Sequence, residues 1–268
     1  MSTLSNTVKL HVEDLGTGDP ALVFLHYWGG SSRTWRHVTQ ALAPAFRTLA
    51  IDQRGWGQSE APPSGYALAD LAADAEGVIE ALNLRDYVLV GHSMGGKVAQ
   101  LMASRRPQGL AGLVLVAPSP PQPMRMPAEA REGMAQAYSS REAVEATIDN
   151  VLTAKQLVAA DREQVIEDSL RGAPQAKAAW PRATSLEDIS DKVANITAPT
   201  LVVAGELDRV DSVDLLKAEL LTRVPHAVLQ VLPGTGHLSM LETPRTLARI
   251  IANFANSLST ATHAGVEP

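Results

Sequence analysis

A serine at position 93 stands between two glycines in the pattern Gly91-x-Ser93-x-Gly95. Residues with strand propensity precede the pattern at 87–90, and helix-forming residues follow it from 97. In a very tight strand-to-helix turn the serine is pushed out into a cleft. The positions two before and two after it must lack side chains so that strand and helix do not collide. The helix also directs its positive end at any oxyanion formed there, so this stretch predicts a nucleophilic serine.

Two further residues, Asp208 and His237, could complete the chemistry that such a serine needs. A serine hydroxyl is a poor nucleophile until a base takes its proton, and an imidazole can accept that proton. A carboxylate can in turn hold the imidazole tautomer and stabilise the imidazolium. Glu206 and Asp211 are competing carboxylates beside Asp208. Because Ser93, Asp208 and His237 each follow a predicted strand, we expect them to meet at the carboxyl edge of one parallel sheet.

The elements that must position these residues alternate between apolar strands and helices. This rhythm predicts an α/β fold with a doubly wound, mostly parallel sheet. We expect strands at 7–12, 21–25, 47–51, 87–90, 110–117, 199–204 and 227–232. We expect helices at 31–42, 68–82, 97–105, 212–221 and 242–258.

The rhythm breaks at a proline-rich stretch that begins at Pro118. Residues 120–190 look purely helical, with helices expected at 127–138, 140–152 and 161–170 and breaks at Pro174 and Pro181. Because so short a segment is close to the lower limit for a core of its own, we predict an inserted helical cap. The α/β core would then comprise 1–119 and 191–258, and a disordered tail is expected at 259–268.

The composition narrows the function classes. The chain has 268 residues, of which 45% are hydrophobic and 19% charged, a formal net charge of -6 and no cysteine. The acidic balance favours neither nucleic acid nor an anionic membrane as a partner, and the lack of cysteine excludes disulfides and thiolate chemistry. No targeting or membrane-spanning segment is evident. We therefore expect a cytoplasmic monomer or homodimer that acts on a small molecule without a metal or cofactor.

Taken together, the motifs resemble those of the α/β-hydrolase fold family over about residues 7–258. The resemblance implies a catalytic triad with Ser93 as nucleophile, His237 as base and Asp208 as acid, because the family spacing after Gly205 favours Asp208 over its neighbours. The motifs that carry it are His26-x-Trp28-x-Gly30-Ser31, Asp52-x-Arg54-Gly55-x-Gly57-x-Ser59, Gly91-His92-Ser93-Met94-Gly95-Gly96, Gly205-x-x-Asp208 and Gly236-His237.

The resemblance also implies an oxyanion hole made of two backbone N–H groups. One belongs to Met94, and the other comes from the loop after His26, where Trp28 is favoured and Tyr27 is the alternative. Relatives usually carry His-Gly where this chain has His26-Tyr27, so Tyr27 adds bulk beside the hole. We expect Tyr27, Trp28, Met94 and Trp180 to contact substrate. Three cap methionines either line the pocket or pack the cap onto the core: Met124, Met126 and Met134.

Other polar residues of these motifs are expected to be structural. His26 at a strand end should be hydrogen-bonded within the core, and His92 should order the loops near the elbow. The Asp52-Gln53-Arg54-Gly55 stretch predicts a turn with a buried ion pair.

A serine nucleophile implies acyl transfer and excludes the aspartate-nucleophile branches of the family, the haloalkane dehalogenases and epoxide hydrolases. The sequence therefore predicts hydrolysis of a small to medium carboxylic ester or lactone through an acyl-enzyme. Alternatives are a carbon–carbon bond hydrolase of dienoic ring-fission products, a cofactor-free perhydrolase, and a small-lactone receptor on the same fold. The bulky loop at Tyr27 and the Leu238 that follows His237 count against the carbon–carbon hydrolase.

Overall fold

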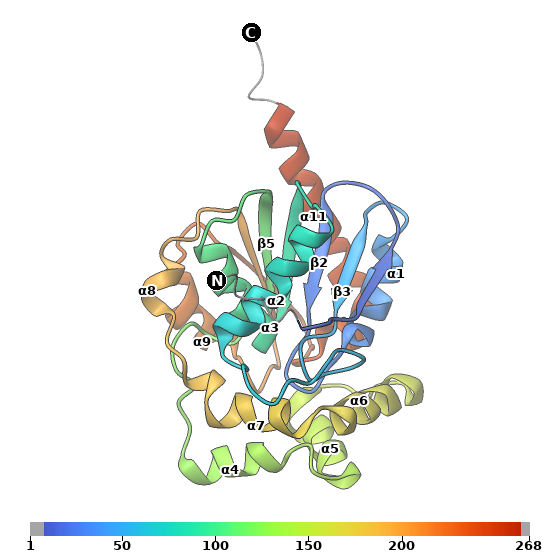
Figure 1. Ribbon diagram of the computed structural model, residues 1–268, viewed down its shortest axis with the longest axis vertical. Helices are drawn as coiled ribbons and strands as arrows, with labels where there is room; N and C mark the ends of the chain where they lie inside the picture. The colour runs from blue at the N-terminus through green and yellow to red at the C-terminus, as the bar shows by residue number, and fades with distance from the viewer. Residues whose placement is uncertain (1–7, 264–268) are drawn as a thin grey trace, which may run out of the picture.

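Seven strands form one sheet at the centre of the computed structural model, which describes residues 8–263 and the side chains of residues 8–258. The strand order is β1-β3-β2-β4-β5-β6-β7 (Figure 1). β1 is antiparallel to β3, and every other pair is parallel. The strands are β1 Val12–Leu15, β2 Ala21–Leu25, β3 Thr48–Ile51, β4 Tyr87–His92, β5 Leu110–Val116, β6 Thr200–Gly205 and β7 Val228–Leu232. The expected doubly wound, mostly parallel α/β fold is confirmed.

Three of the strands that lead to the proposed site residues are buried along their length, as continuous apolar runs predict. β2, β4 and β6 have every residue buried, whereas the edge strand β7 is largely exposed. The first strand was placed too early by the sequence pattern. Residue 7 lies outside the described residues, and residues 9–11 instead hydrogen-bond to the loop that follows β3, at Asp52, Ser59 and Glu60.

Helices cover both faces of the sheet. The pair α2 (Leu68–Ala81) and α3 (Met94–Ser104) lies in front in Figure 1, and the pair α1 (Arg36–Leu42) and α11 (Pro244–His263) lies behind. Shorter elements complete the core: η1 Ser32–Trp35, α8 Ser190–Val193, α9 Val213–Leu216, η4 Lys217–Leu221 and α10 Ser239–Glu242. Among the described residues, no helix is both long enough and apolar enough to cross a membrane.

The chain after His237 differs from the expected single helix at 242–258. A short helix, α10, ends at Glu242, and α11 begins at Pro244, since proline is suited to the first position of a helix. Residues 259–263, which we expected to be part of a disordered tail, continue α11. Residues 264–268 lie outside the described part of the chain.

Helical segments from the middle of the chain lie together below the sheet in Figure 1. They are α4 Ala128–Gln136, α5 Arg141–Thr147, η2 Ile148–Leu152, α6 Ala159–Arg171, α7 Pro174–Arg182 and η3 Thr184–Leu186. The expectation that Pro174 and Pro181 break this region was wrong, because both lie within α7. Pro174 occupies the first turn, where its missing N–H costs nothing. Pro181 cannot bond the carbonyl of Lys177 four residues earlier, and the indole N–H of Trp28 donates to that carbonyl instead, at 3.2 Å.

Ion pairs whose carboxylates are buried hold α6 against the core. Asp168 on α6 accepts hydrogen bonds from the Ser31 hydroxyl at 2.9 Å and from Arg33 Nε at 3.0 Å. About two turns earlier on the same helix, Asp161 pairs with Arg36 and His37. These middle segments (α4 to η3), referred to below as the cap, are thereby fixed to the segment that directly follows the loop at Trp28.

Candidate active site

Ser93 sits on a strained turn between β4 and α3. Its φ of 52° and ψ of -115° lie outside the regions that non-glycine residues usually adopt, which costs about 1–3 kcal/mol. A Cβ on Gly91 would lie 2.4 Å from the carbonyl oxygen of Gly95, and a Cβ on Gly95 would lie 2.5 Å from that of Leu25. Both positions therefore require glycine, at Gly91 because strand and helix would collide, as the sequence pattern suggested, and at Gly95 because the neighbouring strand β2 lies close.

Asp208 and His237 form a buried pair. Asp208 Oδ2 accepts a hydrogen bond from His237 Nδ1 at 2.8 Å. Asp208 Oδ1 accepts the backbone N–H groups of Val210 at 2.7 Å and Asp211 at 3.1 Å. Burial is the largest single effect and would lower the pKa of His237, but the nearby carboxylates, Asp208 foremost, together outweigh it and raise that pKa above its ordinary value. With Nδ1 held as the donor, Nε2 of His237 is left to accept a proton.

Three carboxylates follow β6, and the structure distinguishes them. Asp208 is the one that bonds to His237. Glu206 is exposed and accepts the backbone N–H of Gly234 at 2.7 Å. Asp211 is only 1% exposed and makes no side-chain hydrogen bond to any described residue, with Oδ2 fully buried. Burial raises the pKa of the Asp211 carboxyl well above its usual range.

A carboxylate that the sequence analysis did not single out supports the loop of His237. Glu242 accepts the backbone N–H of Gly236 at 3.1 Å, and also that of Ala154 in the cap at 3.1 Å. From the other side, His92 Nε2 donates to the carbonyl oxygen of His237 at 3.0 Å, so His92 orders this loop. The sequence pattern predicts only the start of a helix at Glu242, and no local motif marks its long-range role.

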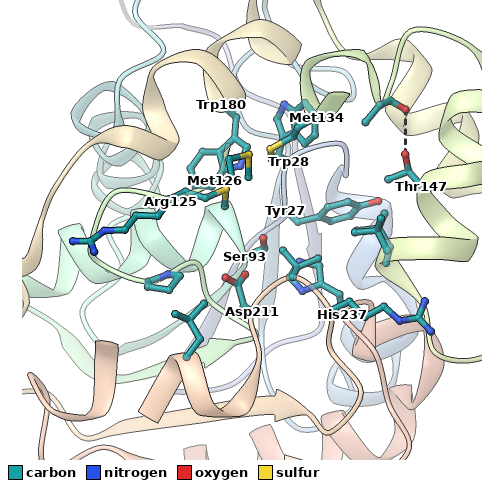
Figure 2. Close-up of a pocket in the computed structure, with 18 of the residues that line it drawn as sticks. Tyr27, Trp28, Ser93, Arg125, Met126, Met134, Thr147, Trp180, Asp211 and His237 are labelled. Carbon is teal, nitrogen blue, oxygen red and sulfur yellow. Dashed lines mark hydrogen bonds between the residues drawn. The ribbon is translucent and has the colours of Figure 1, made fainter. Parts of the chain in front are cut away.

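Ser93, Asp211 and His237 line one cavity of about 480 Å³ that lies between the core and the cap (Figure 2). The Ser93 hydroxyl makes no hydrogen bond to any described residue, and such contacts commonly tighten only when substrate binds. Tyr27 and Trp28 also line the cavity, and so do the cap residues Met124, Met126, Met134 and Trp180. The side chain of Met94 is buried but is not part of this lining, contrary to expectation.

The loop after β2 is held from both the core and the cap. His26 is fully buried; its Nδ1 donates to the carbonyl oxygen of Tyr27 at 2.7 Å, and its Nε2 accepts from the N–H of Gln53 at 3.0 Å. This histidine is therefore structural. The hydroxyl of Tyr138, in the cap, donates to the carbonyl oxygen of Trp28 at 2.8 Å. The backbone N–H of Trp28 makes no hydrogen bond within the described part of the chain.

The ion pair in the turn after β3 does not form between Asp52 and Arg54, the two charged residues of the turn itself. Arg54 pairs with Asp74 of α2 at 2.6 Å. Asp52 instead accepts the backbone N–H groups of Ser32 at 2.5 Å and Gln58 at 2.8 Å, and so ties two loops together. Among the residues that the structure describes, no three His, Cys, Asp or Glu side chains are grouped so as to hold a metal ion.

Comparison with known proteins agrees with the fold and with the motifs. A model described as "Alpha/beta hydrolase family" matches residues 22–250. The chain belongs to the alpha/beta hydrolase family. This hydrolase is 30% identical to a non-heme haloperoxidase of Rhodococcus erythropolis over 251 residues, which cover 88% of this chain and 91% of that protein.

Two solved structures resemble this alpha/beta hydrolase over nearly its whole length. An esterase from Exiguobacterium antarcticum has a TM-score of 0.86 at 22% identity, covering 93% of this chain and 96% of the esterase, which shows likeness of fold alone. An N-acyl homoserine lactone degrading enzyme has a TM-score of 0.81 at 27% identity, covering 93% and 98% of the two chains. The named activities differ, so the substrate must be argued from the site.

Proposed function

We propose that the protein is a serine hydrolase that cleaves a small to medium, largely apolar carboxylic ester or lactone through an acyl-enzyme. The observation that carries this proposal is the shared cavity of Ser93 and His237, with Asp208 bonded to the far side of the imidazole at 2.8 Å. This combination supplies a nucleophile, a base and a group that orients the base.

In this proposal His237 Nε2 takes the proton of the Ser93 hydroxyl while Oγ attacks the carbonyl carbon of the ester. The tetrahedral intermediate collapses by breaking its bond to the alkoxy oxygen, and His237 returns the proton to that leaving group. A water molecule then repeats the sequence on the acyl-enzyme, losing its proton to His237 and releasing the acid. Asp208 stabilises the imidazolium in both halves of the reaction.

The oxyanion of the intermediate would be held by the backbone N–H groups of Met94 and Trp28. Met94 is the first residue of α3, where an N–H has no partner within the helix. The N–H of Trp28 is likewise unpaired among the described residues, and its carbonyl is fixed by Tyr138. Two such donors, held in place before the reaction, lower the barrier because they need no reorganisation.

The cavity supports an apolar substrate of modest size. Its volume of about 480 Å³ falls in the range of small-molecule sites. Thioether and aromatic side chains from the cap cover the side that faces Ser93, including Met126, Met134 and Trp180.

Perhydrolysis is the second candidate, favoured by the likeness to the haloperoxidase. In that reaction hydrogen peroxide replaces water as the nucleophile that attacks the acyl-enzyme at Ser93, which gives a peracid and the free serine. The triad and the oxyanion donors would serve both reactions equally, so only the second nucleophile distinguishes them.

The test is a substrate screen combined with mass spectrometry of the intact protein. p-Nitrophenyl esters of increasing acyl length are compared with lactones, dienoic ketones, and acetate in the presence of hydrogen peroxide. We expect repeated turnover of short esters or lactones and a transient mass increase equal to the acyl group on Ser93. Cleavage of the dienoic ketones alone would contradict the proposal, and so would a single turnover without release, as a receptor would show.

A further inference from the structure

The catalytic scheme above does not use Asp211, although this carboxyl group lines the same cavity as Ser93. Figure 2 shows it beside Ser93, with its oxygens directed toward that residue. The side chain is 1% exposed, and no described residue donates a hydrogen bond to it. A buried polar group without a partner is destabilising, so the fold retains an unsatisfied group in the cavity where the substrate would bind.

The surroundings of Asp211 disfavour its ionised form. Its own backbone N–H bonds to Asp208 Oδ1 at 3.1 Å, which brings a second carboxylate close to it. Two groups act the other way: His237, on the loop after β7, and Lys97, on α3, favour the ionised form of Asp211 when they carry a positive charge. The Lys97 ammonium, however, donates to the carbonyl oxygen of Gln122 at 2.9 Å, not to Asp211. Burial is the largest effect and raises the pKa of the carboxyl well above its usual range.

A neutral carboxylic acid differs from a carboxylate in what it can offer a ligand. A carboxylate only accepts hydrogen bonds, whereas the protonated acid has an O–H that can donate one. No described residue accepts a hydrogen bond from the Asp211 carboxyl or donates one to it, and the side chain faces the cavity. The partner that would satisfy this O–H is therefore an acceptor atom of the substrate.

We propose that Asp211 is a specificity-determining residue whose neutral carboxyl group donates a hydrogen bond to a second oxygen of the substrate, close to the scissile carbonyl. This inference rests on the proposed ester or lactone hydrolysis. It narrows the substrate class to esters or lactones with an additional oxygen acceptor near the reacting carbon, such as 3-oxoacyl esters. A purely aliphatic acyl chain would leave the Asp211 carboxyl unpaired and would be selected against.

The experiment compares ethyl 3-oxobutanoate with ethyl butanoate, which have the same chain length, by the ratio of their kcat/KM values. Using a ratio within each variant cancels the intrinsic reactivity of the esters. Asp211→Val removes the donor, and Asp211→Asn keeps a donor in the form of the amide N–H. Asp188→Asn is the matched control, because it removes an exposed carboxylate that also acts on Lys97.

We expect Asp211→Val to lower the ratio by about tenfold or more, as the loss of one buried hydrogen bond implies. Asp211→Asn should keep the ratio within about threefold, and Asp188→Asn should leave it unchanged. In the wild type the ratio should fall as the pH rises, because the ionised carboxylate cannot donate, and Asp211→Asn should abolish that fall. The pH comparison decides the question even if Asp211→Val fails to fold.

A ratio that is the same in the wild type and in Asp211→Val would overturn the inference, as would a wild-type ratio that does not change with pH. In either case wild-type turnover of ethyl butanoate would leave the proposed hydrolase function standing. If the wild type hydrolyses neither these two esters nor the p-nitrophenyl esters, the proposed function and this inference both fail.

Discussion

The carbonyl oxygen of Leu152, the last residue of η2 in the cap, accepts the backbone N–H of His237 at 3.0 Å and that of Leu238 at 3.1 Å. The proposed base is thus hydrogen-bonded to the cap through its own main chain. Glu242 reinforces this connection, because its carboxylate accepts N–H groups from Gly236 on one side and Ala154 on the other. The geometry of the proposed triad consequently depends on where the cap sits.

A first prediction concerns Glu242. In Glu242→Ala the backbone N–H groups that it satisfies lose their acceptor, each at a cost of about 1–3 kcal/mol when buried. We expect a lower melting temperature and a fall in kcat that exceeds the change in KM, because His237 is displaced. Glu242→Gln keeps one acceptor oxygen, so its melting temperature and kcat should lie between those of Glu242→Ala and the wild type.

The control for this effect is Glu206→Ala. Glu206 also accepts a backbone N–H in this region, that of Gly234, but it is exposed. Its loss should leave kcat within about twofold. Equal effects of the two alanine variants on kcat would show that Glu242 does not position His237.

A second prediction concerns Ser93→Ala. The variant should lose hydrolysis by at least about ten-thousandfold, because loss of the nucleophile removes the covalent route. Its melting temperature should stay close to that of the wild type, since one oxygen facing a cavity contributes little packing. Ser119→Ala, which removes a buried hydroxyl that has no partner in the described part of the chain, is the control and should remain active. Retention of more than a hundredth of the activity in Ser93→Ala would remove the serine from the mechanism.

A third prediction concerns Asp208→Asn and the pH profile. In the wild type kcat/KM should rise with pH through an ionisation above the ordinary histidine value of 6.5, because Asp208 raises the pKa of His237 and only the neutral imidazole is a base. Asp208→Asn should slow hydrolysis by about four orders of magnitude through the wrong tautomer. The residual activity should show its acid limb at lower pH, because burial then acts without the carboxylate. A limb that stays in place would point to a different acid.

The sequence was informative where chemistry imposes local spacing. Glycine is required at Gly91 by a contact inside the elbow, with the carbonyl oxygen of Gly95, and at Gly95 by the close end of the neighbouring strand β2. Both glycines belong to the motif, so the motif could predict the turn at Ser93. The buried strands could also be predicted, because near-continuous apolar runs are typical of strands that are buried on both faces of a parallel sheet. Their order of appearance predicted the edge at which the motifs meet.

Contacts between segments far apart in the chain could not be predicted in this way. Arg54 pairs with Asp74 twenty positions on, and the carbonyl of Lys177 freed by Pro181 is taken by Trp28. From the local sequence alone Pro181 predicts the end of a helix, but the distant indole of Trp28 supplies the hydrogen-bond donor that the proline lacks. For the same reason the long-range role of Glu242 left no mark in the sequence.

A fourth prediction concerns stability and Asp211. The pKa of this carboxyl in the folded protein is raised above that of an ordinary aspartic acid, about 3.9 in the unfolded chain. The folded state then binds more protons than the unfolded state between these two pKa values, so stability falls as the pH rises through that window. Asp211→Asn carries no such proton. The difference between its melting temperature and that of the wild type should therefore shift in favour of the variant as the pH rises from about 4. A difference that is constant with pH would show that Asp211 titrates normally.

The last prediction concerns Tyr27, where the family usually has glycine. Its ring is 2% exposed, lies 5.3 Å from the ring of His92, and forms part of the cavity wall. A Cβ on Gly30 would lie 2.6 Å from this ring, so the ring fills the space between the loop and the elbow. Tyr27→Gly should therefore enlarge the cavity and raise kcat/KM for esters with bulky acyl groups relative to acetate esters.

The same substitution should lower the melting temperature, because removing a buried aromatic ring costs about 3–5 kcal/mol. Tyr27→Phe is the control: it keeps the ring and removes only the hydroxyl, so the acyl-length profile should stay that of the wild type. Activity of Tyr27→Gly on acetate should fall by less than the roughly hundredfold expected for a lost oxyanion donor, since the backbone N–H groups remain. An unchanged acyl-length profile in Tyr27→Gly would mean that the ring does not limit the acyl site. Loss of all activity in Tyr27→Phe would instead assign the hydroxyl a direct part in the chemistry, and the oxyanion arrangement of Met94 and Trp28 would have to be replaced.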